Sequence, residues 1–182
     1  IAAEGAINAE MNKVTNKIVA YPSGQQFRWT MLNLGMVEIL GVELGTETAM
    51  KFGKVDGALR LNYTYQKARD FTDRADSYYG DQIPYIPLHS GSVAGRLSWR
   101  GWDFNYSFIY TGERYNAQEN IPQNHEQPWY THDASLVWNF PLNKVRCRVG
   151  LEVNNIFDQD YEVILNYPMH GRNYKVTLKI NI

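Results

Sequence analysis

NYKVTLKINI, residues 173–182, alternates polar and apolar side chains at every position. Successive side chains of a β-strand point to opposite faces, so this period of two gives a strand with one apolar and one polar face. VRCRVGLEVN, residues 145–154, shows the same pattern, with Val, Cys, Val, Leu and Val at alternate positions. We therefore predict two strands of one antiparallel sheet in this part of the chain.

Six further segments upstream are expected to form strands, four of which carry the same alternation. They centre on residues 5–19, 29–51, 59–66, 92–99, 102–111 and 133–140. No segment shows the apolar stripe with a period of 3.6 residues that marks an amphipathic helix. The sequence therefore predicts an all-β fold of eight strands.

The connections between these strands alternate in length. Tight turns are expected at residues 52–56, 100–102 and 141–144. Long polar loops are expected at residues 21–26, 70–87 and 115–128, with a further loop near residues 164–170. Short turns on one side and long loops on the other are typical of outer-membrane β-barrels.

Aromatic residues make up 14% of the chain, and they cluster at the strand ends. Trp99, Trp102, Trp138 and Phe140 lie beside the short turns, and Tyr63, Tyr65, Tyr110 and Trp129 lie towards the long loops. Amphipathic rings at two levels suit the two interfaces of a lipid bilayer. A soluble β-sandwich is the alternative, but it would bury its apolar faces and need no aromatic belts. We therefore expect a transmembrane antiparallel β-barrel wall in contact with outer-membrane lipid.

Composition removes several other classes of protein. The formal net charge of −1 argues against a nucleic-acid-binding surface. The single cysteine, Cys147, leaves no intrachain disulfide and no zinc site built from cysteine pairs. The longest apolar runs fall short of the roughly 18 residues that suggest a transmembrane helix. Because the chain starts at Ile1 without a methionine or a signal peptide, we expect it to be a mature or proteolysed fragment, or a chain whose upstream part is missing.

Two stretches near the C-terminus resemble the closing motif of TonB-dependent receptors. VNNIFDQDYE, residues 153–162, is similar to the family's N-L-F-D-x-x-Y-E segment, and NYPMHGRNY, residues 166–174, is similar to its Y-P-x-P-G-R-x-Y segment. Further similar stretches are NLGMVEILGVEL (33–44), NYTY (62–65), IPYIP (83–87) and TGERY (111–115). His170 stands where a proline is common, and Ile182 stands where many relatives carry phenylalanine. The overall character is that of the cobalamin-receptor and colicin I-receptor subgroup, with a Bacteroidetes-like sequence.

This resemblance implies a 22-stranded barrel in the bacterial outer membrane, of which residues 1–182 would form about the last eight strands. An N-terminal plug domain, absent from this sequence, would fill the barrel and carry the segment that contacts TonB. The implied function is active import of a scarce nutrient chelate, energised through TonB, with a surface lipoprotein as a further candidate partner. Cobalamin, a ferric siderophore, haem and a glycan would suit such a wall equally well.

Two other membrane proteins remain as alternatives. Eight strands can also close on themselves, which would give a self-contained barrel acting as an anchor or adhesin. A passive porin is the other alternative. A plug of about 100–150 residues upstream, a usual domain size, would select the receptor.

No arrangement of residues suggests an enzyme, a cofactor or a metal site. His89, His125, His132 and His170 are scattered without the spacing of a zinc hydrolase, although His125 or His170 could touch a haem or metal in the ligand. Gly171 and Arg172 are interpreted as a loop-to-strand device, in which the glycine adopts a φ value that other residues resist.

Charged residues on the polar faces of the strands are the first candidate functional group. A cation facing lipid at the bilayer midplane would cost about 2–4 kcal/mol, so these side chains are expected to face the lumen. They are Arg60, Arg96, Arg146, Arg148 and Glu152, together with Glu43 and Glu47. We interpret them as partners of the plug or of each other. A direct role in substrate passage is the alternative.

Polar and aromatic residues of the long loops are the second candidate group. Aromatic and amide side chains offer contact area and orientable hydrogen bonds to a bulky chelate. The candidate ligand-binding residues are Tyr78, Tyr79, Tyr85, Asn116, His125, Trp129 and Tyr130, with Asn120 and Gln123 beside them. The alternative is that the tyrosines anchor the protein at the membrane interface and that the polar residues are solvated.

Overall fold

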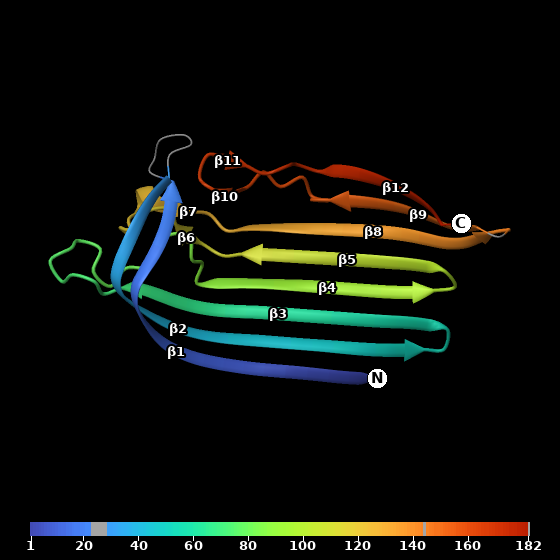
Figure 1. Cartoon of the computed structure of the whole chain (residues 1–182), viewed down its shortest axis with the longest axis horizontal. Coiled ribbons are helices and arrows are strands. Elements are labelled where there is room, and N and C mark those ends of the chain that lie inside the picture. The colour runs from blue at the N-terminus through green and yellow to red at the C-terminus, as the bar shows by residue number, and fades with distance from the viewer. Residues whose placement is uncertain (23–28, 144, 182) are drawn as a thin grey trace.

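The computed structural model describes residues 1–22, 29–143 and 145–181. Its main element is one antiparallel sheet of eight strands, whose order in space follows their order along the chain (Figure 1). The strands, in spatial order, are β1 (Ala2–Pro22), β2 (Trp29–Phe52), β3 (Val55–Asp70), β4 (His89–Trp99), β5 (Trp102–Thr111), β8 (Trp129–Leu142), β9 (Val145–Asn154) and β12 (Asn173–Asn181). The eight predicted strands and the all-β class are thereby confirmed.

The sheet is open in the residues that the structure describes. β1 pairs only with β2, and β12 pairs only with β9, so the sheet has two free edges. Short turns join β2 to β3, β4 to β5 and β8 to β9 at one end, where both termini also lie, and the long connections lie at the other end (Figure 1). The predicted alternation of connection lengths is thus present. The predicted loop at residues 21–26 lies largely outside the described residues, apart from Tyr21 and Pro22 at the end of β1.

The turn between β4 and β5 shows how the sequence makes a tight connection. Arg100 and Gly101 both have positive φ, 46° and 88°, as two-residue hairpin loops with primed turns require. A Cβ on Gly101 would lie 2.5 Å from the backbone oxygen of Asn139 on β8. Glycine therefore allows β8 to approach the turn closely.

The long connections contain secondary structure that the alternation did not predict. β6 (Arg114–Tyr115) pairs with β7 (His125–Glu126), and a 3-10 turn, η1 (Pro122–Asn124), precedes β7. β10 (Glu162–Ile164) pairs with β11 (Tyr167–Pro168) where a plain loop was expected. These short hairpins pair backbone groups that the main sheet leaves without partners.

The two faces of the main sheet differ in polarity. On one face the side chains of Leu151, Val176 and Leu178 are 53%, 73% and 66% exposed. A small buried cluster of Leu34, Val37, Ala68 and Ile83 lies at the end with the long connections. A β-sandwich would bury its apolar faces between two large sheets, whereas here the apolar face is uncovered. Among the described residues there is no helix with the length and apolar character needed to cross a membrane.

Candidate functional site: a polar wall and a cluster of long connections

The polar face of the sheet carries two neighbouring rows of cross-strand residues. Strict alternation places them on the face opposite to the exposed apolar residues. One row runs Glu47, Arg60, Ala94, Ser107 and Asp133 from β2 to β8. The other runs Arg96, Asn105, Ser135, Glu152 and Lys175 from β4 to β12.

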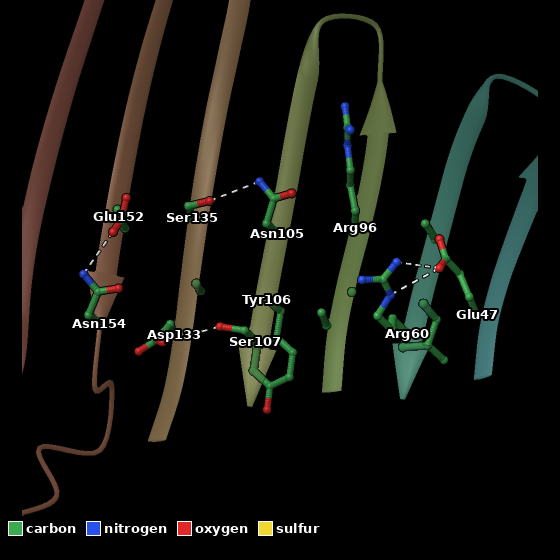
Figure 2. A pocket seen from close by; sticks show the side chains of 15 residues that line it. Glu47, Arg60, Arg96, Asn105, Tyr106, Ser107, Asp133, Ser135, Glu152 and Asn154 are labelled. Atoms are coloured by element: carbon green, nitrogen blue, oxygen red, sulfur yellow. Dashed lines mark hydrogen bonds and ion pairs between the residues drawn. The ribbon is translucent and has the colours of Figure 1, made fainter. Parts of the chain in front are cut away.

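These rows form a shallow hollow of about 430 Å³ whose charged groups are largely paired (Figure 2). The guanidinium Nη2 of Arg60 lies 2.6 Å from Oε2 of Glu47, and Nη2 of Arg96 lies 3.0 Å from Oδ1 of Asp103. The Asn105 amide donates to the Ser135 hydroxyl at 3.1 Å. Such a surface offers donors, acceptors and both signs of charge to a polar partner that covers it.

The remaining predicted lumen residues follow the same face. Glu152 lines the hollow, and its Oε2 lies 3.7 Å from Nζ of Lys175. Arg146 and Arg148 are on the same face, nearer the short turns, and form no ion pair with any residue that the structure describes. The geometry therefore groups all five predicted residues on one face, and their role stays a prediction.

A second candidate site lies at the other end of the sheet, where Arg114 of β6 joins two connections. Arg114 is 4% exposed, and its guanidinium donates to the backbone oxygens of Gln127, Glu162 and Val163 at 3.2, 2.7 and 3.1 Å. Burial lowers the pKa of Arg114. Arg114 forms no ion pair with a carboxylate among the described residues, although the nearby charge of Glu126 acts against the effect of burial on its pKa.

A cavity of about 300 Å³ lies beside this guanidinium, with Tyr85 and Trp129 in its lining. Trp129 Nε1 is buried and donates no hydrogen bond within the described structure. The Tyr85 hydroxyl is also buried, and it faces the backbone of Leu165 without a hydrogen bond of good geometry. Burial raises the pKa of Tyr85, which keeps the phenol neutral and able to donate. The cavity thus collects a cation and two free donors, a combination suited to a ligand with anionic or acceptor oxygens.

The other predicted loop residues are divided between three places. Asn116 donates to Glu126 at 2.6 Å and His125 Nε2 lies 3.2 Å from Glu113, so both belong to the β6–β7 hairpin next to Arg114. Tyr79 packs edge-on against Phe71, and Tyr78 lies beside Asp76, whose hydrogen bond raises the pKa of Tyr78. Neither Tyr78 nor Tyr79 lines the cavity.

Tyr130 is on the apolar face of β8, 42% exposed, next to Phe108 and His132. This position of Tyr130 agrees with the alternative that the loop tyrosines anchor the protein at the membrane interface. Trp129, its neighbour, points to the other side because adjacent strand residues face opposite ways. In the described residues, no group of three His, Cys, Asp or Glu side chains could hold a metal ion.

Gly171 and Arg172 form the predicted loop-to-strand device, but the reason for the glycine was wrong. Gly171 does not have a positive φ. A Cβ there would lie 2.9 Å from Oδ1 of Asp158, and the same oxygen accepts from the backbone N–H of Arg172 at 2.7 Å. Close approach of the aspartate side chain therefore selects the glycine.

Comparison with known proteins identifies this architecture. The family model described as TonB dependent receptor-like, β-barrel matches residues 11–156. The chain belongs to the TonB-dependent receptor β-barrel family. The resemblance predicted from the closing motif is thereby confirmed at the level of the family.

Solved receptors share the fold of this family member. The siderophore receptor PiuA from Acinetobacter baumannii superposes with a TM-score of 0.72 at 17% identity, over 97% of this chain and 26% of that one. The ferric preacinetobactin receptor BauA from the same organism gives 0.75 at 11% identity, over 98% and 27%. The ferric yersiniabactin uptake receptor FyuA from Yersinia pestis gives 0.67 at 18% identity, over 98% and 26%. The chain thus spans about a quarter of the length of these receptors, and the expected cobalamin and colicin I subgroup stays a prediction.

Proposed function

We propose that this TonB-dependent receptor segment is the C-terminal wall of an outer-membrane importer of a small-molecule metal chelate. In this proposal the apolar face contacts outer-membrane lipid, and the polar face lines a lumen filled by an N-terminal plug that contacts TonB. The single observation that carries the proposal is the open sheet with one polar and one apolar face. Its free edges, β1 and β12, suit a wall that continues into further strands better than a closed eight-stranded anchor.

The cavity between Arg114, Tyr85 and Trp129 is the proposed contact for the chelate. It lies among the long connections, which are the extracellular side in outer-membrane barrels. A ferric siderophore presents the oxygen-rich, often anionic groups that unpartnered donors and a guanidinium without an ion pair would bind. The names of the similar solved receptors favour this class over cobalamin, haem or a glycan.

Conservative removal of the two free donors tests the proposal. Tyr85→Phe and Trp129→Phe delete a hydroxyl and an indole N–H that make no good hydrogen bond in the protein, so folding should be retained. Each lost bond to a charged ligand group costs about 1.5–3 kcal/mol, so uptake and binding of the cognate iron-labelled siderophore should fall at least about tenfold.

Matched controls are Tyr174→Phe and Trp102→Phe, on the exposed apolar face of β12 and β5. These should leave uptake unchanged in cells that carry the full-length receptor and TonB. Equal affinities for the donor variants and the controls would remove this cavity from the ligand site.

A further inference from the structure

The apolar face of the sheet carries a groove that the receptor function does not explain. It has a volume of about 740 Å³ and crosses β1 to β5. Its lining is predominantly apolar, and the outward-facing residues that form it include Ile7, Leu44, Leu61, Tyr63, Val93 and Phe108.

A glycine on β4 opens this groove. Gly91 lies directly between Tyr63 of β3 and Tyr110 of β5 in the cross-strand register. A Cβ at Gly91 would lie 3.2 Å from the backbone oxygen of Asn62, so a side chain there would be crowded. The two tyrosine rings therefore flank a position without a side chain, and the gap continues over Val93.

The groove lies within the part of the face that would contact hydrocarbon. Tyr110 lies eight residue steps after Trp102, which is about 27 Å along the strand and about 20 Å along the membrane normal at the usual tilt. This span is close to the apolar band of about 25 Å between the two aromatic girdles of outer-membrane barrels. The groove is therefore continuous with the proposed lipid contact, and its occupant has to be an apolar chain from the bilayer.

Two cations lie on the apolar face of β3, between the groove and the long connections. Lys67 and Arg69 share the parity of Tyr63 on β3, and neither forms an ion pair with any residue in the described ranges. Glu38 is directly opposite Arg69, but its carboxylate lies 2.7 Å from Nζ of Lys13.

The other nearby carboxylate contacts a histidine. Glu113 lines a hollow of about 270 Å³ with Lys67 and Arg69, and its Oε2 lies 3.2 Å from Nε2 of His125, a contact that is an ion pair only when the imidazole is protonated. The Cα of Lys67 is about 13 Å along the strand from that of Tyr63, which places its ammonium at the level of lipid headgroups. Neither cation forms an ion pair with these carboxylates, so both can bind an anion from outside the protein.

We infer that this face binds a phosphorylated, acylated lipid of the outer leaflet, with one acyl chain in the groove and a phosphate at Lys67 and Arg69. The inference rests on the proposed membrane orientation, because the long connections must lie outside. It concerns a lipid site on the outer wall whose phosphate end approaches the loops, because the hollow beside Lys67 and Arg69 is also lined by Arg114 of the chelate cavity. A specifically bound lipid there would hold β1 to β5 at a fixed depth in the membrane.

Native mass spectrometry of the full-length receptor in detergent, titrated with diphosphoryl lipid A, tests the inference. We expect one lipid A to bind in preference to its dephosphorylated form. The Lys67→Gln/Arg69→Gln variant should weaken lipid A binding about 30-fold, from two cations at about 1 kcal/mol each, without changing binding of the dephosphorylated form. Lys54→Gln, at a short turn, is the charge control and should bind as the parent does.

Filling the groove gives a second, independent arm. Val93→Trp should abolish binding of both lipids, whereas Leu151→Trp, on the same face outside the groove, should not. Equal lipid A binding by all variants, in a receptor that fractionates with the outer membrane, would overturn the lipid site alone. A receptor that does not fractionate with the outer membrane would overturn the proposed function as well.

Discussion

Lys179 of β12 lies directly opposite Arg148 of β9 on the polar face of the sheet. Neither cation forms an ion pair with the residues that the structure describes. Like charges directly opposite each other destabilise an antiparallel pair. In the proposed wall around a plug, a carboxylate of the plug would remove this repulsion, so we predict that the plug contacts this pair.

Charge reversal at this position should loosen the plug. Arg148→Glu creates an opposite-charge pair with Lys179 inside the wall and repels a plug carboxylate. We expect cells that produce the full-length variant to become more sensitive to large antibiotics that the closed receptor excludes. Lys54→Glu, at a short turn, is the control and should not change sensitivity. Identical sensitivity of the two variants would show that Arg148 does not hold the plug.

Loss of the Arg114 guanidinium should separate the long connections. Arg114→Leu leaves three backbone oxygens without this donor, at a cost of about 1–3 kcal/mol for each one that stays buried. We expect faster protease cleavage within residues 115–128 and 162–168, with the main sheet still folded. Hydrogen exchange of the same segments measures the effect directly. Unchanged exchange in both segments would contradict the role of Arg114 as their link.

Alkaline pH should open the same cluster. Burial raises the pKa of Tyr85 and of Tyr161, so the folded cluster favours the neutral phenols. The stabilisation is fully present below the ordinary tyrosine pKa of about 10 and is lost as pH rises through the higher folded values. Fluorescence of Trp129, which packs on Tyr161 with ring centroids 4.7 Å apart, should report the change above pH about 10.

The Tyr85→Phe/Tyr161→Phe variant removes both titrating groups and should move that transition to higher pH or abolish it. A fluorescence transition at the same pH in this variant would show that groups other than Tyr85 and Tyr161 cause it.

Tyr78 and Tyr79 provide a test of the more distant part of the loops. They do not line the cavity, and the sequence-based prediction that they contact ligand remains untested. Tyr78→Ala/Tyr79→Ala should weaken chelate uptake without loss of the folded barrel, as measured by heat-dependent electrophoretic mobility. Normal uptake by this variant would confine ligand contact to the cavity beside Arg114.

Alternation was sufficient to predict six of the eight strands and their faces, because a single strand already separates polar from apolar side chains. It placed Arg60, Arg96 and Glu152 on one face, as the structure does. Alternation also implies that Trp129 and Tyr130 lie on opposite faces. Treating both as loop residues overlooked this difference. Adjacent strand residues face opposite ways, and β8 begins at Trp129.

The loop site was not predictable in the same way. Arg114 is positioned by backbone oxygens 48 and 49 residues further along the chain, at Glu162 and Val163. A backbone carbonyl has no sequence signature, so only the folded structure reveals this contact. The same holds for Gly171, whose neighbour Asp158 lies across a loop and not beside it in the sequence.

The division of the wall into a lipid face and a lumen face is the central claim, and spin labels on β9 test it most directly. Labels would be attached one at a time at residues 149–152 of the full-length receptor in membranes, with Cys147 replaced. We expect the collision rate of the spin label with oxygen to peak at Val149 and Leu151. At Gly150 and Glu152 we expect it to be low, because these labels face the lumen, where they collide with a water-soluble nickel complex or contact the plug. Oxygen accessibility that peaks at residues 150 and 152, or that shows no period of two, would contradict the account.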